Sequence, residues 1–142
     1  ILRRLRFNTD SREEIVRLIR YHDLPIQPER RPVKRLMNKL GPDTVRRLIE
    51  LHKADTRGQS AICAGRIAEY DAVAVVLDEI LNDKECFSLK DLAVNGTDMM
   101  SIGLAGRDIG RALNACLTAV MEEKLPNERT ALLEYAEQVK KE

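Results

Sequence analysis

Apolar residues recur along the chain at the three- and four-residue spacing of α-helices. One stripe at positions i, i+3, i+4 and i+7 consists of Ile15, Leu18, Ile19 and His22. A second stripe, followed one turn later by Asp55, consists of Val45, Leu48, Ile49 and His52. Both stripes predict amphipathic helices, and both place a histidine on the buried side of its helix.

The longest predicted helix spans residues 60–82. Its apolar residues keep helical spacing through Tyr70, Ala74, Leu77 and Leu81. This spacing outweighs the strand preference of the valines at 73, 75 and 76.

Capping and breaking residues separate the predicted helices. Residues 1–7 have the pattern of a helix tail, and residues 8–11 form a capping cluster before a helix that reaches about residue 22. A loop with three prolines spans 24–32, and Gly41 ends a short basic helix over 33–40. Pro42 begins the next helix, which residues 56–58 break. We therefore expect an all-α fold, a multi-helix array.

The stretch from 88 to 134 has the most distinctive pattern, with short helices joined at glycines. Asn95-Gly96 has the composition of a turn with positive φ, and a long helix follows Gly106 and stops at Pro126. Asn127 is expected to cap the last helix. Gly103 and Gly106 open the long helix, where exposed N–H groups could bind an anion such as a phosphate. The alternative is that both glycines only form a tight corner between helices.

Composition indicates a globular domain and argues against a membrane-spanning, disulfide-bonded or zinc-knuckle protein. The 142 residues are 44% hydrophobic and 33% charged, which is typical of a globular domain. The longest apolar run, 72–77, is too short for a membrane span. Three cysteines without a Cys-x-x-Cys pair argue against a disulfide framework or zinc knuckle and fit a reducing cytosol.

The charges are unevenly distributed. Residues 1–60 hold 15 Lys and Arg against 8 Asp and Glu, a net +7, whereas residues 61–142 have a net charge of −6. The basic half indicates either a polyanionic partner or a set of solvated helix faces.

Few residues have catalytic or metal-binding chemistry. His52 and Asp55 lie one turn apart and could share a cation, and His22 could join them if the two helices pack together. The alternative is a partly buried histidine hydrogen-bonded to a carboxylate. Asp23 follows His22. The sequence has no phosphate-binding Gly-x-x-x-x-Gly-Lys loop, no Gly-x-Ser-x-Gly elbow and no Asp-x-Asp pair for two magnesium ions.

Several motifs in order resemble the C-terminal tRNA-binding region of bacterial tRNA nucleotidyltransferases, the CCA-adding enzymes related to poly(A) polymerases. They are Leu92-Ala93-Val94-Asn95-Gly96-x-Asp98, then Gly103, Gly106, Ile109-Gly110-x-x-Leu113, and Leu125-Pro126-Asn127-Glu128-Arg129. The family usually has Gly-Pro at the start of the long helix, whereas Arg107 follows Gly106 here. Residues 19–23 and 52–60 resemble the HD-type helical domain that follows the catalytic head in these enzymes.

The resemblance implies two domains: the back of an HD-type domain over 1–84 and a tRNA-binding domain over 85–142. It implies tRNA as the partner, a cytoplasmic location, and a missing N-terminal head that adds nucleotides with Mg, ATP and CTP; the chain itself would hold no cofactor. The implied RNA contacts are Arg57, Lys90, Gly103, Gly106, Arg107 and Arg111, and the implied metal ligands are His22 and Asp55. Two alternatives stay open: a fragment of an HD-type metal-dependent phosphohydrolase, and a helical protein-interaction module.

Overall fold

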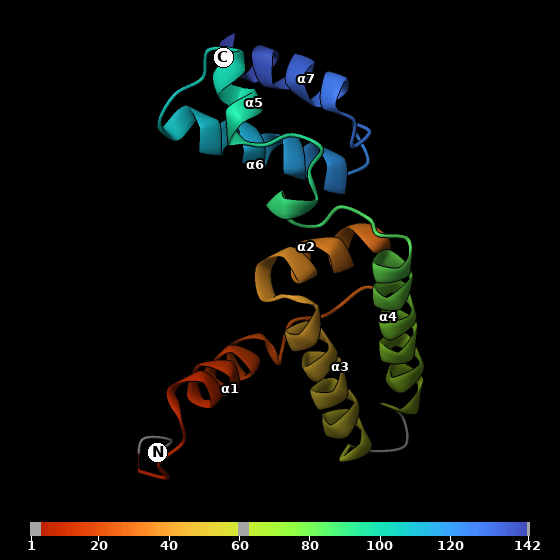
Figure 1. Ribbon diagram of the computed structural model, residues 1–142. Coiled ribbons are helices and arrows are strands. Elements are labelled where there is room, and N and C mark those ends of the chain that lie inside the picture. Colours follow the sequence, from red (N-terminus) through yellow and green to blue (C-terminus); the bar gives the residue numbers. More distant parts are fainter. Residues whose placement is uncertain (1–3, 60–62, 142) are drawn as a thin grey trace. The chain divides into compact units, whose positions relative to one another are not determined.

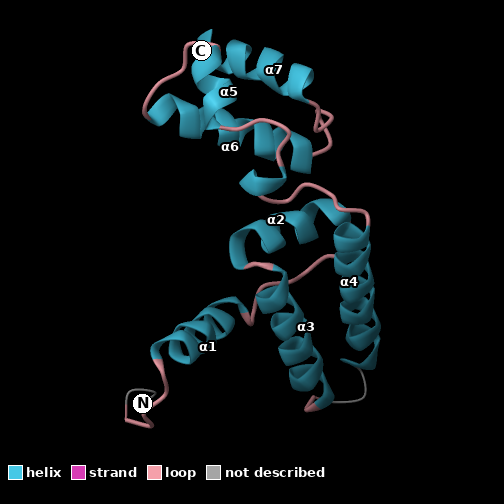
Figure 2. Cartoon of the chain, viewed as in Figure 1, coloured by secondary structure: helices cyan, strands magenta, loops and turns pink. Residues whose placement is uncertain are grey.

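The computed structural model describes residues 4–59 and 63–141, and every regular element within them is a helix (Figures 1 and 2). The expectation of an all-α fold is therefore confirmed. None of the helices in this described part is long and apolar enough to cross a membrane. The chain divides into two compact units, Ile1–Glu79 and Ile80–Glu142, and the division lies inside α4 (Ala64–Asn82). The predicted start of that helix, residues 60–62, lies outside the described residues.

Unit 1 begins with α1 (Thr9–Tyr21), whose start confirms the predicted capping cluster. The side chain of Asn8 accepts a hydrogen bond from the backbone N–H of Ser11 at 2.8 Å, so Asn8 is the N-cap. The prediction of a helix tail over 1–7 is wrong for the residues that are described. Residues 4–6 form a turn, and Arg6 has φ 56°, a conformation that a right-handed helix cannot contain.

The next two helices are α2 (Arg30–Leu40) and α3 (Pro42–Arg57), and Gly41 joins them as predicted. Gly41 has φ 83°, which favours glycine, and its N–H bonds to the carbonyl of Met37 at 2.8 Å. Pro42 then takes the first position of α3, where its missing N–H is not needed.

The core of unit 1 lies between α2, α3 and α4. Its buried apolar residues are Val33, Leu36, Met37, Leu40, Val45, Leu48, Ile49, Val73 and Leu77. Salt bridges join α3 to α4 beside this core: Arg46 lies 2.5 Å from Asp78, and Lys53 lies 2.7 Å from Asp71. The hydrogen bond to Asp71 is the main cause of the raised pKa of Lys53.

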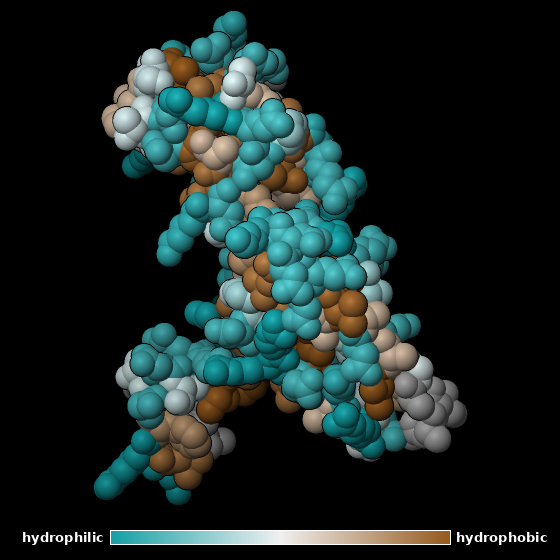
Figure 3. All heavy atoms as spheres, turned by 45° about the vertical axis from the view of Figure 1, so that its right-hand side comes forward, coloured by the Kyte–Doolittle hydropathy of each residue, from teal (hydrophilic) through white to brown (hydrophobic). Residues whose placement is uncertain are grey.

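α1 differs from its predicted role because it has no buried residue. α1 packs on α3, and the Glu14 carboxylate of α1 accepts a hydrogen bond from Arg47 of α3. Ile19, in contrast, is 59% exposed. His22, expected on a buried face, is also exposed. The stripe predicts the helix correctly, but Ile15 and Leu18 are only half-buried, and Ile19 and His22 line an open space beside Leu51 and His52 of α3. Figure 3 shows hydrophobic residues at the surface of the molecule among the hydrophilic ones. The matching prediction for His52 is confirmed, since His52 is 8% exposed.

Unit 2 contains a short 3-10 helix, η2 (Leu89–Asp91), followed by α5 (Gly96–Ser101), α6 (Arg107–Met121) and α7 (Arg129–Lys141). Each of the helices α5, α6 and α7 contacts the other two (Figure 1). They enclose a core of Val94, Met99, Leu104, Ala112, Cys116, Leu132 and Ala136. Burial raises the pKa of the Cys116 thiol, so this cysteine is a neutral core residue.

Two asparagines in unit 2 have roles that differ from the predicted ones. Asn95 is the N-cap of α5, with its side chain accepting from the N–H of Thr97 and Asp98, so Asn95-Gly96 starts a helix and is not a positive-φ turn. The reciprocal hydrogen bond, donated by the backbone N–H of Asn95 to the Asp98 carboxylate at 2.9 Å, completes a capping box.

Asn127 does not cap α7. Its amide group accepts from the N–H of Ala93 at 2.9 Å and donates to the carbonyl of Asp91 at 2.7 Å. It therefore fastens the segment after η2 to the segment before α7. α6 itself ends at Met121, earlier than the predicted stop at Pro126.

Candidate nucleic-acid interface

The start of α6 has the backbone geometry expected of an anion-binding helix terminus. Gly106 is its N-cap with φ 56°, Gly103 has φ 81°, and no side chain caps the helix. A Cβ atom at Gly106 would meet nothing within 4 Å, so the space outside this residue is open. The first-turn N–H groups of a 15-residue helix carry a partial positive charge here, although the N–H of Asp108 already bonds to the carbonyl of Ala105 at 3.2 Å.

The space beside Gly103 is taken by another part of unit 2. A Cβ atom on Gly103 would lie 3.0 Å from the amino group of Lys140, which donates a hydrogen bond to the carbonyl of Ile102 at 3.1 Å. Lys140 thus pairs with a carbonyl at the C-terminal end of α5, where a cation is favourable. At Gly103 the tight corner between helices explains why the residue is a glycine. At Gly106 the space is open, so an anion can approach the backbone there.

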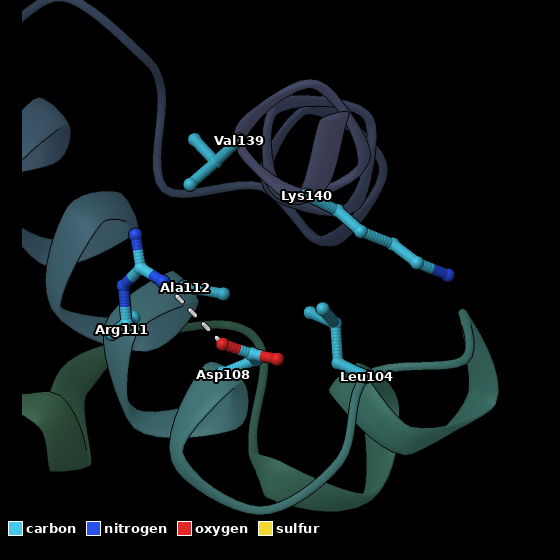
Figure 4. Close-up of a pocket in the computed structure, with 6 residues that line it drawn as sticks. All are labelled: Leu104, Asp108, Arg111, Ala112, Val139 and Lys140. Atoms are coloured by element: carbon cyan, nitrogen blue, oxygen red, sulfur yellow. Dashed lines mark hydrogen bonds and ion pairs between the residues drawn. The ribbon is translucent and has the colours of Figure 1, made fainter. Parts of the chain in front are cut away.

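A pocket of about 230 Å³ opens between α6 and α7 next to this corner. It is lined by Leu104, Asp108, Arg111, Ala112, Val139 and Lys140 (Figure 4). Arg111 lies 3.5 Å from Asp108, and in Figure 4 the side chains of Arg111 and Lys140 extend to opposite sides of the pocket. Two separated cations suit an extended, repeating anion better than one compact anion.

The structure brings together four of the six predicted RNA contacts. Gly103, Gly106, Arg107 and Arg111 lie at the corner between α5 and α6, and both arginines are exposed. Lys90 lies on η2, away from this corner. The residue after it, Asp91, accepts a hydrogen bond from Asn127, which follows the C-terminal end of α6. Arg57 is the exposed last residue of α3, in unit 1.

Lys140 is a residue of this corner that the sequence does not reveal. It lies 37 positions after Gly103, at the end of α7, and only the packing of α7 against α5 brings its amino group to the carbonyl of Ile102. The basic last turn of α7 is the available signal, but it indicates helix-end stabilisation as readily as a ligand contact.

The two predicted metal ligands lie around one hollow of unit 1. His22 and Asp55 both line it, together with His52, and both are exposed. The Nε2 atom of His22 lies 3.1 Å from Asp23, and Asp55 accepts a hydrogen bond from Gln59 at 3.1 Å. Among the residues that the structure describes, no three or more His, Cys, Asp or Glu side chains form a group able to hold a metal ion.

Comparison with known proteins identifies one family. The family model described as tRNA nucleotidyltransferase domain 2 matches residues 1–136, nearly the whole chain. Neither a curated protein nor a solved structure matches the chain.

Proposed function

The chain belongs to the tRNA nucleotidyltransferase domain 2 family, and we propose that it is the part of such an enzyme that binds tRNA while a separate catalytic head extends the 3′ end. In this proposal the head uses Mg, ATP and CTP to add the CCA end or adenylates. The chain has no Asp-x-Asp pair to position two metal ions, so it supplies binding and no nucleotidyl transfer.

The observation that carries the proposal is the open, glycine-capped start of α6 with its exposed arginines. Arg107 occupies the first helical position, and Arg111 lies one turn later on the same side of the helix. A phosphate at this end would meet backbone N–H groups, the positive end of the helix dipole and a guanidinium group. Such contacts recognise the RNA backbone and are independent of base sequence.

The charge of the surrounding surface limits how such a site works. Residues 61–142 have a net charge of −6, and Asp108 lies beside Arg111 in the pocket. The overall field of this part of the chain therefore opposes a polyanion, so binding depends on short-range contacts at the corner. We expect weak binding by the isolated chain.

Replacement of Arg107 tests the proposal. Arg107→Gln removes the charge at the helix start, and we expect a loss of about 1 kcal/mol, roughly five-fold in the dissociation constant for tRNA measured by fluorescence anisotropy. Lys124→Gln is the control because Lys124 is an exposed cation beyond the C-terminal end of α6. It lies about 25 Å from Arg107, counted along the helix axis at about 1.5 Å per residue. Arg129 is unsuitable as a control because it pairs with Asp98 at 2.6 Å.

Equal binding by the parent chain and Arg107→Gln would contradict the proposal. The α6 corner would then be a surface for another protein or another domain, as the interaction-module alternative holds.

A further inference from the structure

A groove on unit 1 lies between α1 and α2, and the proposed RNA contacts do not use it. It consists of two hollows of about 370 and 330 Å³, and Lys39 lines both of them. The first hollow lies between α1 and the C-terminal end of α2, and the second lies between residues 24–26 and α2. We call the two hollows together the α1–α2 groove.

Part of the lining of this groove is apolar. Leu36 and Leu40 of α2 are each 7% exposed, whereas Val16 of α1 is 48% exposed and Leu24 is 42% exposed. The lining therefore combines buried leucines with aliphatic side chains that stand in water. Covering such surface is favourable, and exposed apolar surface bordered by polar groups is typical of interaction sites.

Basic side chains border this apolar surface. Arg17, Arg20 and Lys39 line the first hollow together with a single carboxylate, that of Glu13, and all three basic residues are exposed. Neither arginine forms a salt bridge with another residue that the structure describes. The amino group of Lys39 lies 5.1 Å from the ring centroid of Tyr21, and this contact holds it at the groove. Because residues 1–60 also have a net charge of +7, the groove attracts an acidic ligand.

Nucleic acids and acidic proteins are the two classes of large ligand with this charge. A phosphate backbone offers no apolar side chains to cover Val16, Leu24 or Leu40. A nucleobase would need the ring of Tyr21, and Lys39 already covers one face of that ring. An amphipathic helix whose apolar stripe is flanked by carboxylates matches both the apolar lining and the basic border, which is the usual way in which a helix binds in a groove.

We infer that the α1–α2 groove binds an acidic amphipathic helix of a partner protein. The apolar stripe of this helix covers Val16 and Leu24, and its carboxylates pair with Arg17, Arg20 and Lys39. The basic residues speed the encounter and set the preference for an acidic partner, while the apolar contact supplies the rest of the affinity. The inference goes beyond the proposed function and does not depend on the start of α6, so either can fail without the other.

A synthetic peptide tests the inference on the whole chain. The probe is a fluorescein-labelled helical peptide of about 18 residues, with leucines at positions i, i+3, i+4 and i+7 and glutamates beside them. One control peptide has the same residues in an order without an apolar stripe, and a second has lysine in place of glutamate. In fluorescence anisotropy we expect a dissociation constant for the probe that is at least about ten-fold lower than for either control peptide. An excess of unlabelled tRNA should leave the probe bound.

Two pairs of variants connect the binding to the named side chains. Val16→Ser should weaken binding of the probe at least about three-fold, and Val75→Ser, the same change at a 56% exposed valine of α4, should not change it. Arg20→Gln should weaken binding about five-fold and reduce its salt dependence, whereas Arg4→Gln, at an exposed arginine before α1, should change neither.

Three results would each overturn the inference. The first is a probe that binds no better than the peptide without an apolar stripe. The second is binding by Val16→Ser and Arg20→Gln that equals that of the parent chain. The third is displacement of the probe by tRNA, which would assign the α1–α2 groove to a nucleic acid.

Discussion

Replacing Asn127 by aspartate separates two roles of this residue that the sequence alone cannot distinguish. As an N-cap of α7, Asn127 would be replaced well by Asp, because aspartate caps helices as effectively and its charge suits the helix dipole. In the structure, however, the side chain of Asn127 accepts from Ala93 N–H and donates to the Asp91 carbonyl. Aspartate keeps the acceptor but loses the donor, and its second oxygen faces a carbonyl oxygen. The structure therefore predicts that Asn127→Asp destabilises unit 2.

The expected magnitude follows from the two hydrogen bonds. A hydrogen bond contributes about 0.5–1.5 kcal/mol net, and the Asn127 side chain is exposed, so each of its bonds belongs at the lower half of that range. Loss of one bond, together with repulsion between the two oxygens, gives about 1–2 kcal/mol for Asn127→Asp. Asn127→Ala loses both bonds without the repulsion and should cost a similar amount.

Hydrogen exchange measured by mass spectrometry is the suitable assay, because the two units need not unfold together and exchange reports on each separately. Peptides from α6 and α7 should exchange about 5- to 30-fold faster in Asn127→Asp. Asn114→Asp is the control: Asn114 donates to the Gly110 carbonyl at 2.8 Å, but the helix also uses that carbonyl, so little changes. Unchanged or slower exchange in Asn127→Asp would show that Asn127 acts as a helix cap.

Three other predictions follow from the same structure. Gly103→Ala should destabilise unit 2 by about 1–2 kcal/mol because φ is 81°, whereas Gly96→Ala should be nearly neutral because its Cβ only touches Ile109 at 3.6 Å; urea denaturation compares them. The pKa of His52 is lowered in the folded state, so as the pH falls the histidine is protonated in the unfolded state before it is protonated in the folded state. The stability of unit 1 should therefore be highest above about pH 6.5 and fall as the pH drops below it through the lowered pKa, and His52→Gln should flatten that dependence in exchange experiments across pH 5–8. Elemental analysis after dialysis should find well under one divalent metal per chain, and a stoichiometric metal lost on mutation of His22 or Asp55 would contradict this.

Helix boundaries were predictable from sequence where one residue determines the local backbone. Gly41 followed by Pro42 ends one helix and starts another, and Gly106 opens α6, because glycine allows positive φ and proline fits the first helical position. The asparagines were harder, because the same side chain can cap a helix, form a turn or bridge two segments. Asn127 bonds to groups 34 and 36 positions away, and no local pattern reports such partners.

The candidate sites were predictable only in part, for a similar reason. The stripe through His22 gives the helix correctly, but periodicity does not reveal whether another element covers that face. Likewise, the glycine pattern locates the start of α6, but only the packing of α7 places Lys140 beside Gly103 and leaves Gly106 open. The sequence therefore identifies the corner, while its chemistry depends on contacts between distant residues.

The salt dependence of tRNA binding tests the central claim most directly. Phosphate contacts release counterions, so the logarithm of the binding constant should fall linearly with the logarithm of salt concentration. With Arg107 and Arg111 as contacts, we expect a slope of about −1.5 to −2 for the parent chain. The slope should become shallower by about one unit in Arg107→Gln and stay unchanged in Lys124→Gln. A binding constant that does not change with salt concentration, or the same slope in all three proteins, would contradict the claim that the α6 corner contacts the phosphates of the RNA backbone.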